Sequence, residues 1–90
     1  MAPSPTSQIA GRRARFAQAY DEHFRAVSAY ALRRTTPAEA EDVVAETFLV
    51  AWRRLDELPD EPRPWLLGIA RRVLANQRRA QHLRVVRRHL

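Results

Sequence analysis

Arginine is the residue type of this chain whose number and placement could do chemistry. Residues 63–90 contain eight arginines and no acidic residue, and the whole chain contains no lysine. An arginine side chain presents a planar fork of N–H donors, which binds phosphate oxygens in pairs and stacks on bases. A segment with this charge has the electrostatic footprint of a nucleic-acid binder, and the alternative is an ordinary solvated charged face. We favour contact with nucleic acid, because no acidic side chain on the segment neutralises the arginines.

Asn76 lies among these arginines at helical spacing. Arg72, Asn76 and Arg79 follow one another at i, i+4 and i+7, which places them on one face of a helix. The amide of asparagine carries both donors and an acceptor, so it can read the edge of a base. Trp65 could stack on an unpaired base. At the start of an amphipathic helix, however, we favour packing of this tryptophan into the core.

Residues 37–62 carry the opposite charge. They contain eight acidic residues and two arginines, so the formal charge changes from −6 in this segment to +8 in residues 63–90. Charge segregated in this way predicts two surfaces with two different partners. The exposed side of the acidic segment suits a protein interface and an ordinary solvated helix face equally well. Three prolines lie where the charge changes, and because proline fixes φ and lacks an amide donor, we expect a stiff loop over residues 58–64 that can hold a shaped pocket.

No set of residues resembles a catalytic or metal site. The chain has no cysteine, and its three histidines stand at spacings that match no metal motif. Ser28 and Thr47 have no base and orienting group suggested nearby, and no glycine-rich loop is present to bind phosphate. His23 is expected to be structural. We therefore predict that the protein is not an enzyme and uses neither a metal nor a cofactor.

Helices must position the residues named above. Alanine, leucine, arginine and glutamate dominate, only two glycines occur, and strand-like alternation is missing, which together favour helix. We predict an all-α fold, a small bundle of three main helices with frayed N- and C-terminal tails. The chain is expected to form a single domain over residues 1–90, with an ordered core at about residues 14–81. The helices are predicted over residues 14–34, 37–56 and from 64 to about 81.

The sequence also indicates how these helices begin and pack. Thr36 and Glu39 form a capping box around Pro37, the clearest helix start in the chain. Gly68 inside the third helix costs about 1 kcal/mol relative to alanine, which indicates close packing there. The second helix is apolar on more than one face, so we expect a second neighbour, which in so small a domain is another protein. The first helix carries an apolar stripe that we expect to be buried, made of Phe16, Tyr20, Phe24, Val27 and Ala31.

The distribution of apolar residues bears on location. No stretch of the chain approaches the roughly 18 apolar residues that a membrane span needs. Residues 1–7 are small and polar, without the apolar run of a signal peptide. We therefore expect a cytoplasmic protein without a membrane span.

Three segments of the chain resemble region 2 of the extracytoplasmic-function (group IV) sigma factors of bacterial RNA polymerase. Residues 20–24 read YDEHF and are similar to the opening of that region. The most characteristic stretch of the family resembles residues 40–52, AEDVVAETFLVAW, and its promoter-reading helix resembles residues 64–76, PWLLGIARRVLAN. The resemblance covers residues 16–79, with the three motifs in the order and at the separations of the family.

This resemblance implies two main partners. The second helix would dock on the clamp coiled coil of the largest subunit of core RNA polymerase. The proline-rich loop and the third helix would bind the promoter −10 element, where in such proteins the loop captures a flipped-out base of the non-template strand. The candidate DNA-binding residues are Arg63, Trp65, Arg71, Arg72, Asn76, Arg78 and Arg79. The candidate polymerase-binding residues are Asp42, Ala45, Glu46, Leu49 and Arg53.

The implied function is that of a sigma factor domain that binds core RNA polymerase and recognises and helps to melt the −10 element. The alternative is a helical protein-interaction module whose main partner is a regulatory protein such as an anti-sigma factor, with arginines that only solubilise it. Ala45 stands where the family usually has glutamine, which removes a hydrogen-bonding side chain from the polymerase interface. We also expect the chain to lack the second domain of the family, a helix-turn-helix that reads the −35 element.

Overall fold

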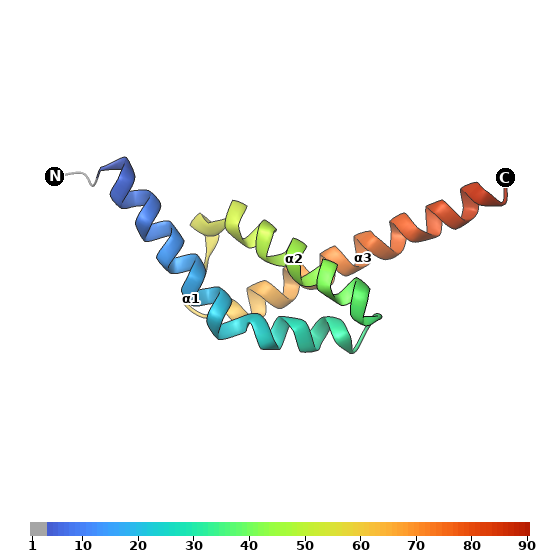
Figure 1. The fold of residues 1–90 in the computed structure, drawn as a ribbon, viewed down its shortest axis with the longest axis horizontal. Helices are drawn as coiled ribbons and strands as arrows, with labels where there is room; N and C mark the ends of the chain where they lie inside the picture. The colour runs from blue at the N-terminus through green and yellow to red at the C-terminus, as the bar shows by residue number, and fades with distance from the viewer. Residues whose placement is uncertain (1–3) are drawn as a thin grey trace.

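A computed structural model describes residues 4–90 as three α-helices and one short 3₁₀ helix. The order is α1 (Pro5–Leu32), α2 (Pro37–Arg53), the 3₁₀ helix Leu55–Glu57 and α3 (Pro62–Arg88). No strand occurs in this part of the chain, so the predicted all-α bundle is confirmed. The three helices cross in a short central body, and the first turns of α1 and the last turns of α3 project from opposite ends (Figure 1). The molecule measures 62 × 26 × 18 Å as a result.

Two helices begin with the same local chemistry. Thr36 caps α2 by accepting a hydrogen bond from the backbone N–H of Glu39 at 3.3 Å, with Pro37 in the first turn, which confirms the predicted cap. Ser4 caps α1 by accepting from the backbone N–H of Ser7 at 3.2 Å, again followed by proline. In each case a side-chain oxygen satisfies an N–H group that has no partner within the helix.

The helices extend beyond their predicted ends, so the predicted frayed tails are wrong for residues 5–13 and 82–88. At the N-terminus, Ser4 and Pro5 form a second Ser/Thr–Pro start signal. At the C-terminus, neither glycine nor proline follows Gly68, so nothing interrupts the helix. Both extensions are almost entirely exposed and therefore rest on local propensity rather than on the core. Residues 1–3 of the expected polar tail lie outside the described range.

The core lies where the three helices cross. Val27 of α1, Val43 of α2, Leu55 of the 3₁₀ helix and Leu66 of α3 are fully buried. The second helix ends at Arg53 rather than at the predicted residue 56, and the tighter 3₁₀ turn that follows carries Leu55 into this core. Burial of these apolar side chains is the main favourable term in the stability of so small a domain.

The predicted buried stripe of α1 is only partly correct. Val27 and Ala31 are buried, but Tyr20 and Phe24 are each 38% exposed, and Ala19 and His23 are buried instead. The buried face of α1 is therefore rotated toward its smaller side chains. The aromatic side chains lie at the edge of the core, where they line a groove rather than fill the interior.

Hydrogen bonds connect the distal half of α3 to the end of α1 and the start of α2. The side-chain amide of Gln81 donates to a carboxylate oxygen of Glu39 at 2.7 Å, and the hydroxyl of Thr35 donates to the other oxygen. These hydrogen bonds, that of Thr35 above all, hold the pKa of Glu39 below its ordinary value, because they stabilise the charged form. Arg78 donates to the backbone carbonyl of Arg34 at 2.7 Å, just beyond the end of α1. The two contacts made by Gln81 and Arg78 set the direction in which α3 leaves the core.

A Cβ added at Gly68 would meet no atom within 4 Å, so the close packing inferred at that glycine is wrong. None of the helices in residues 4–90 combines the length and the hydropathy that crossing a bilayer requires.

Candidate nucleic-acid and protein interfaces

The structure exposes almost every residue predicted to bind a partner. Trp65 alone among them is half-buried: it packs against the core, with the guanidinium of Arg54 5.8 Å from the centre of its ring. This contact favours the interpretation of Trp65 as a packing residue. The exposed candidates are Asp42, Ala45, Glu46, Leu49 and Arg53 on α2 and Arg63, Arg71, Arg72, Asn76, Arg78 and Arg79 on α3.

A groove of about 750 Å³ runs between α2 and α3, and we call it the α2–α3 groove. One wall carries Asp42 and Glu46, and the other carries Arg72 and Asn76. Apolar side chains complete the groove, so charged groups of both signs border an apolar strip, as in many protein–protein interfaces. The remaining lining residues are Ala45, Leu49, Val50, Arg54, Ile69, Val73, Gln77 and Ala80.

Asn76 therefore lies with the residues predicted to bind polymerase. It is fourteen positions beyond Pro62 on α3, which corresponds to about 21 Å along the helix axis. This separation argues against a contact between Asn76 and a base that is held at the proline-rich loop. The sequence placed both in one DNA-binding site, and the structure places them on different parts of the surface.

A second hollow, of about 200 Å³, lies at the proline-rich loop, and we call it the corner cavity. The loop side consists of residues 58–60 together with Pro62, and this location agrees with the pocket expected there. The opposite side is polar and comes from α1: the amide of Gln18 donates to the carboxylate of Glu22 at 3.2 Å, and Arg15 lies beside them. Donors and acceptors of this kind can pair with the edge of a base.

Sequence reasoning did not identify these α1 residues. The signal that would have found them is their spacing, because Arg15, Gln18 and Glu22 fall at i, i+3 and i+7 on one polar face of the first helix. That face becomes informative only once the fold shows that it meets the loop, since the contact joins residues about 40 positions apart in sequence.

The arginines of α3 differ in how far they are already engaged. Arg63 donates from Nε to Nδ1 of His23 at 3.2 Å, and Arg78 is bonded to the carbonyl of Arg34. Within residues 4–90, Arg71, Arg72 and Arg79 make no intramolecular hydrogen bond or ion pair that satisfies their guanidinium groups. The latter three are thus the most available for phosphate oxygens.

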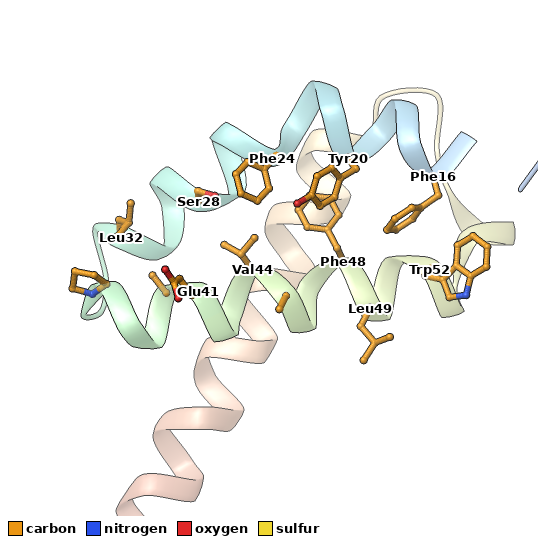
Figure 2. A pocket seen from close by; sticks show the side chains of 13 residues that line it. Phe16, Tyr20, Phe24, Ser28, Leu32, Glu41, Val44, Phe48, Leu49 and Trp52 are labelled. Carbon is orange, nitrogen blue, oxygen red and sulfur yellow. The ribbon is translucent and has the colours of Figure 1, made fainter. Parts of the chain in front are cut away.

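A third hollow, of about 730 Å³, opens between α1 and α2 and is lined largely by aromatic rings, and we call it the aromatic groove. Figure 2 shows Phe16, Tyr20 and Phe24 on α1 gathered along Phe48 of α2, with Trp52 at one end. The rings of Tyr20 and Phe48 have centroids 4.7 Å apart, and those of Phe16 and Trp52 meet edge to face at 5.4 Å. An exposed apolar surface of this kind is typical of a protein-binding site.

No group of three or more His, Asp or Glu side chains in residues 4–90 is placed to hold a metal ion. The hydroxyl of Thr47 is buried and donates to the carbonyl of Val43 at 2.7 Å, one turn earlier in α2. That contact is the local one expected of threonine inside a helix.

Comparison with known proteins gives a consistent answer. The family described as sigma-70 region 2 matches residues 19–84. The ECF RNA polymerase sigma factor SigL of Mycobacterium tuberculosis is 44% identical over 71 residues, which cover 74% of this chain and 40% of the relative. The RNA polymerase sigma factor NccH of Alcaligenes xylosoxydans xylosoxydans is 31% identical over 90 residues, covering 91% of this chain and 48% of the relative. The chain thus spans less than half the length of these relatives. No solved structure matches it.

Proposed function

This chain belongs to the sigma-70 region 2 family, as a domain of the extracytoplasmic-function type, and from that membership we propose that it binds core RNA polymerase and reads the single-stranded −10 element of promoters. The observation that carries the DNA-binding part is the surface of α3. Its arginines are exposed, no acidic residue occurs between residues 63 and 90, and the helix begins at the corner cavity.

On the DNA side, the charged arginines of α3 and the shape of the corner cavity have separate roles. Arg71 and Arg79, which do not line the α2–α3 groove, bind phosphates of the strand and supply affinity that depends on salt. The corner cavity receives a flipped-out base, whose unstacking costs a few kcal/mol. Because prolines stiffen the loop, the cavity is formed before the base arrives and little ordering is needed on binding.

On the polymerase side, the α2–α3 groove receives the clamp coiled coil of the largest subunit. Asp42 and Glu46 line the groove and are exposed, so they can pair with basic side chains of the coiled coil. The apolar strip between the two walls accommodates aliphatic side chains of the same helix pair. In this arrangement, Asn76 faces the polymerase rather than the captured base.

Binding of labelled single-stranded oligonucleotides to the 90-residue chain, measured by fluorescence anisotropy, tests the DNA side. Candidate −10 sequences are compared with the same sequences as duplex, and each titration is repeated at several salt concentrations. We expect tighter binding of the single strand and a fall of log K with log salt, with a slope of about −0.7 for each phosphate contacted. A slope of zero would exclude binding dominated by phosphate.

Capture of core RNA polymerase by the tagged chain tests the proposed polymerase interface. Asp42→Arg combined with Glu46→Arg should abolish capture, because it reverses the charge of one wall of the groove. Asp21→Arg, an equally exposed charge reversal on α1, serves as the control and should leave capture unchanged. Capture that survives the double reversal would contradict the assignment of this groove.

The aromatic groove favours a second candidate function, that of a module that binds a regulatory protein such as an anti-sigma factor. Its observation is the exposure of Tyr20 and Phe24, which leaves aromatic surface uncovered beside α2. This function would be favoured if the chain bound no DNA but bound such a protein tightly. Tyr20→Ser or Phe24→Ser should then abolish binding of that protein. Retention of that protein by both variants would speak against it.

A further inference from the structure

His23 joins two distant segments through one partly buried hydrogen bond. It lies in the middle of α1, its side chain is 10% exposed, and its Nδ1 accepts from Nε of Arg63, the second residue of α3, at 3.2 Å. Its other ring nitrogen, Nε2, has no hydrogen-bond partner within the described residues, and the nearest acidic oxygen is that of Glu22 at 3.7 Å. The contact spans forty positions of the sequence.

The direction of this bond fixes the state of the imidazole. Arginine can only donate, so the lone pair of Nδ1 must be free to accept, and the ring is neutral with its proton on Nε2. A bond between a charged donor and a largely buried acceptor is stronger than one between neutral groups. Its loss would leave a buried ring nitrogen without any partner, which is costly.

The pair lies immediately beside the corner cavity. Ala19 and Glu22 of α1 line that cavity, and so does Pro62, which directly precedes Arg63. Neither His23 nor Arg63 belongs to the lining itself. His23 therefore cannot contact a ligand in the cavity and could influence it only through Arg63.

Arg63 retains binding capacity although its Nε is used. The residue is exposed, and its two terminal amino groups make no hydrogen bond or ion pair within residues 4–90. An arginine that is already anchored at Nε loses less side-chain freedom when the terminal groups bind a phosphate. We propose that His23 is a positioning residue that preorganises Arg63 as a phosphate-binding group at the edge of the corner cavity. This inference rests on the proposed binding of single-stranded nucleic acid.

The test measures affinity for a labelled single-stranded DNA of twelve nucleotides with mixed sequence. His23→Leu replaces the imidazole with an apolar side chain of similar size and so removes the acceptor. We expect it to weaken binding of this DNA about fivefold. His23→Asn places an amide oxygen near the position of Nδ1 and should restore most of the affinity. In an Arg63→Met background, His23→Leu should cause no further loss. His82→Leu, on the exposed distal part of α3, is the matched control.

Nuclear magnetic resonance separates this inference from the proposed function. The Nε–H signal of Arg63 should exchange slowly with water in the wild type and in His23→Asn, and rapidly in His23→Leu. An Nε–H signal that His23→Leu does not alter overturns the anchoring, whatever the affinity for DNA. Equal DNA binding by wild type and His23→Leu overturns the positioning role alone, whereas the absence of DNA binding by a folded wild type overturns the proposed function.

Discussion

Asn76 occupies a wall of the α2–α3 groove opposite the acidic residues of α2, and its amide can meet either a nucleic acid or a protein there. The geometry favours the protein, because the corner cavity lies about 21 Å away along α3. An amide in a groove with charged walls can donate to one partner group and accept from another, and a buried interface would leave it unsatisfied if either were missing.

We therefore predict that Asn76→Ala weakens capture of core polymerase by about fivefold and changes the affinity for single-stranded DNA by less than twofold. Both quantities are measured on the same preparations, by pull-down titration and by fluorescence anisotropy. Arg84→Ala, on the exposed distal part of α3, is the control for general surface effects. Loss of selectivity among −10 sequences, with polymerase capture intact, would instead identify Asn76 as a reader of bases.

Ala45 is the second informative single residue. It is exposed on the acidic wall of the same groove, where the family usually has glutamine. We predict that Ala45→Gln strengthens capture of core polymerase by about three- to tenfold, because a hydrogen bond across the interface contributes about 1 kcal/mol. The same substitution should leave DNA binding unchanged. Unaltered capture would show that the coiled coil does not approach this position.

Among the elements, α3 has two halves with different support. Its first half contributes Leu66, Ile69, Ala70, Val73 and Leu74 to the core, whereas residues 78–90 are exposed throughout. We predict that Leu66→Ala lowers the free energy of unfolding by about 3 kcal/mol, since it leaves a cavity at a fully buried site. Leu83→Ala, the same change on the exposed half, should alter it by less than about 0.5 kcal/mol. Urea unfolding followed by circular dichroism measures both.

Gly68 gives a prediction of the opposite sign on the same helix. No atom within 4 Å would meet an added Cβ, so the residue fits the space and alanine gains the helix propensity that glycine lacks. Gly68→Ala should raise the free energy of unfolding by about 1 kcal/mol, measured by the same denaturation. A decrease would mean that the backbone at this position needs the freedom of glycine in a state other than the one described.

Among the features of the helices, the sequence predicted their number, their order and the cap at Thr36, because these depend on local signals. It did not predict which face of α1 is buried. Tyr20 and Phe24 have the apolar spacing of a core stripe, and only the tertiary packing, which buries Ala19 and His23 instead, decides otherwise. The α1 side of the corner cavity was missed for the same reason, because it depends on a contact between distant segments. The helix at residues 5–13 was missed although its cap at Ser4 is visible in the sequence.

For the molecule as a whole, pH affects the stability of the fold through the hydrogen bonds that hold the distal half of α3. The hydrogen bonds from Thr35 and Gln81 lower the pKa of Glu39 in the folded state relative to the unfolded chain. The stability that they contribute is therefore complete above the ordinary glutamate pKa of about 4.3 and is lost as the pH falls through the lower folded value.

Glu39→Gln should accordingly lower the melting temperature at pH 7 and have a smaller effect at pH 3, because the stabilising contribution in the wild type decreases as the carboxylate becomes protonated. Thermal unfolding by circular dichroism at the two pH values measures the difference. Glu41→Gln, an exposed carboxylate on the same helix, is the control and should show no such dependence. An equal effect of Glu39→Gln at both pH values would show that the hydrogen bonds do not require the charged carboxylate.

One rod borders both proposed sites, because the first residue of α3 lines the corner cavity and its middle forms a wall of the α2–α3 groove. If occupancy of either site tilts that rod, the two ligands become thermodynamically linked through it. Reciprocity then requires that polymerase change the affinity of the chain for the promoter strand by a certain factor. The strand must change the affinity of the chain for polymerase by the same factor. The ratio of the two affinities, each measured with and without the other ligand, would express that linkage as a single number.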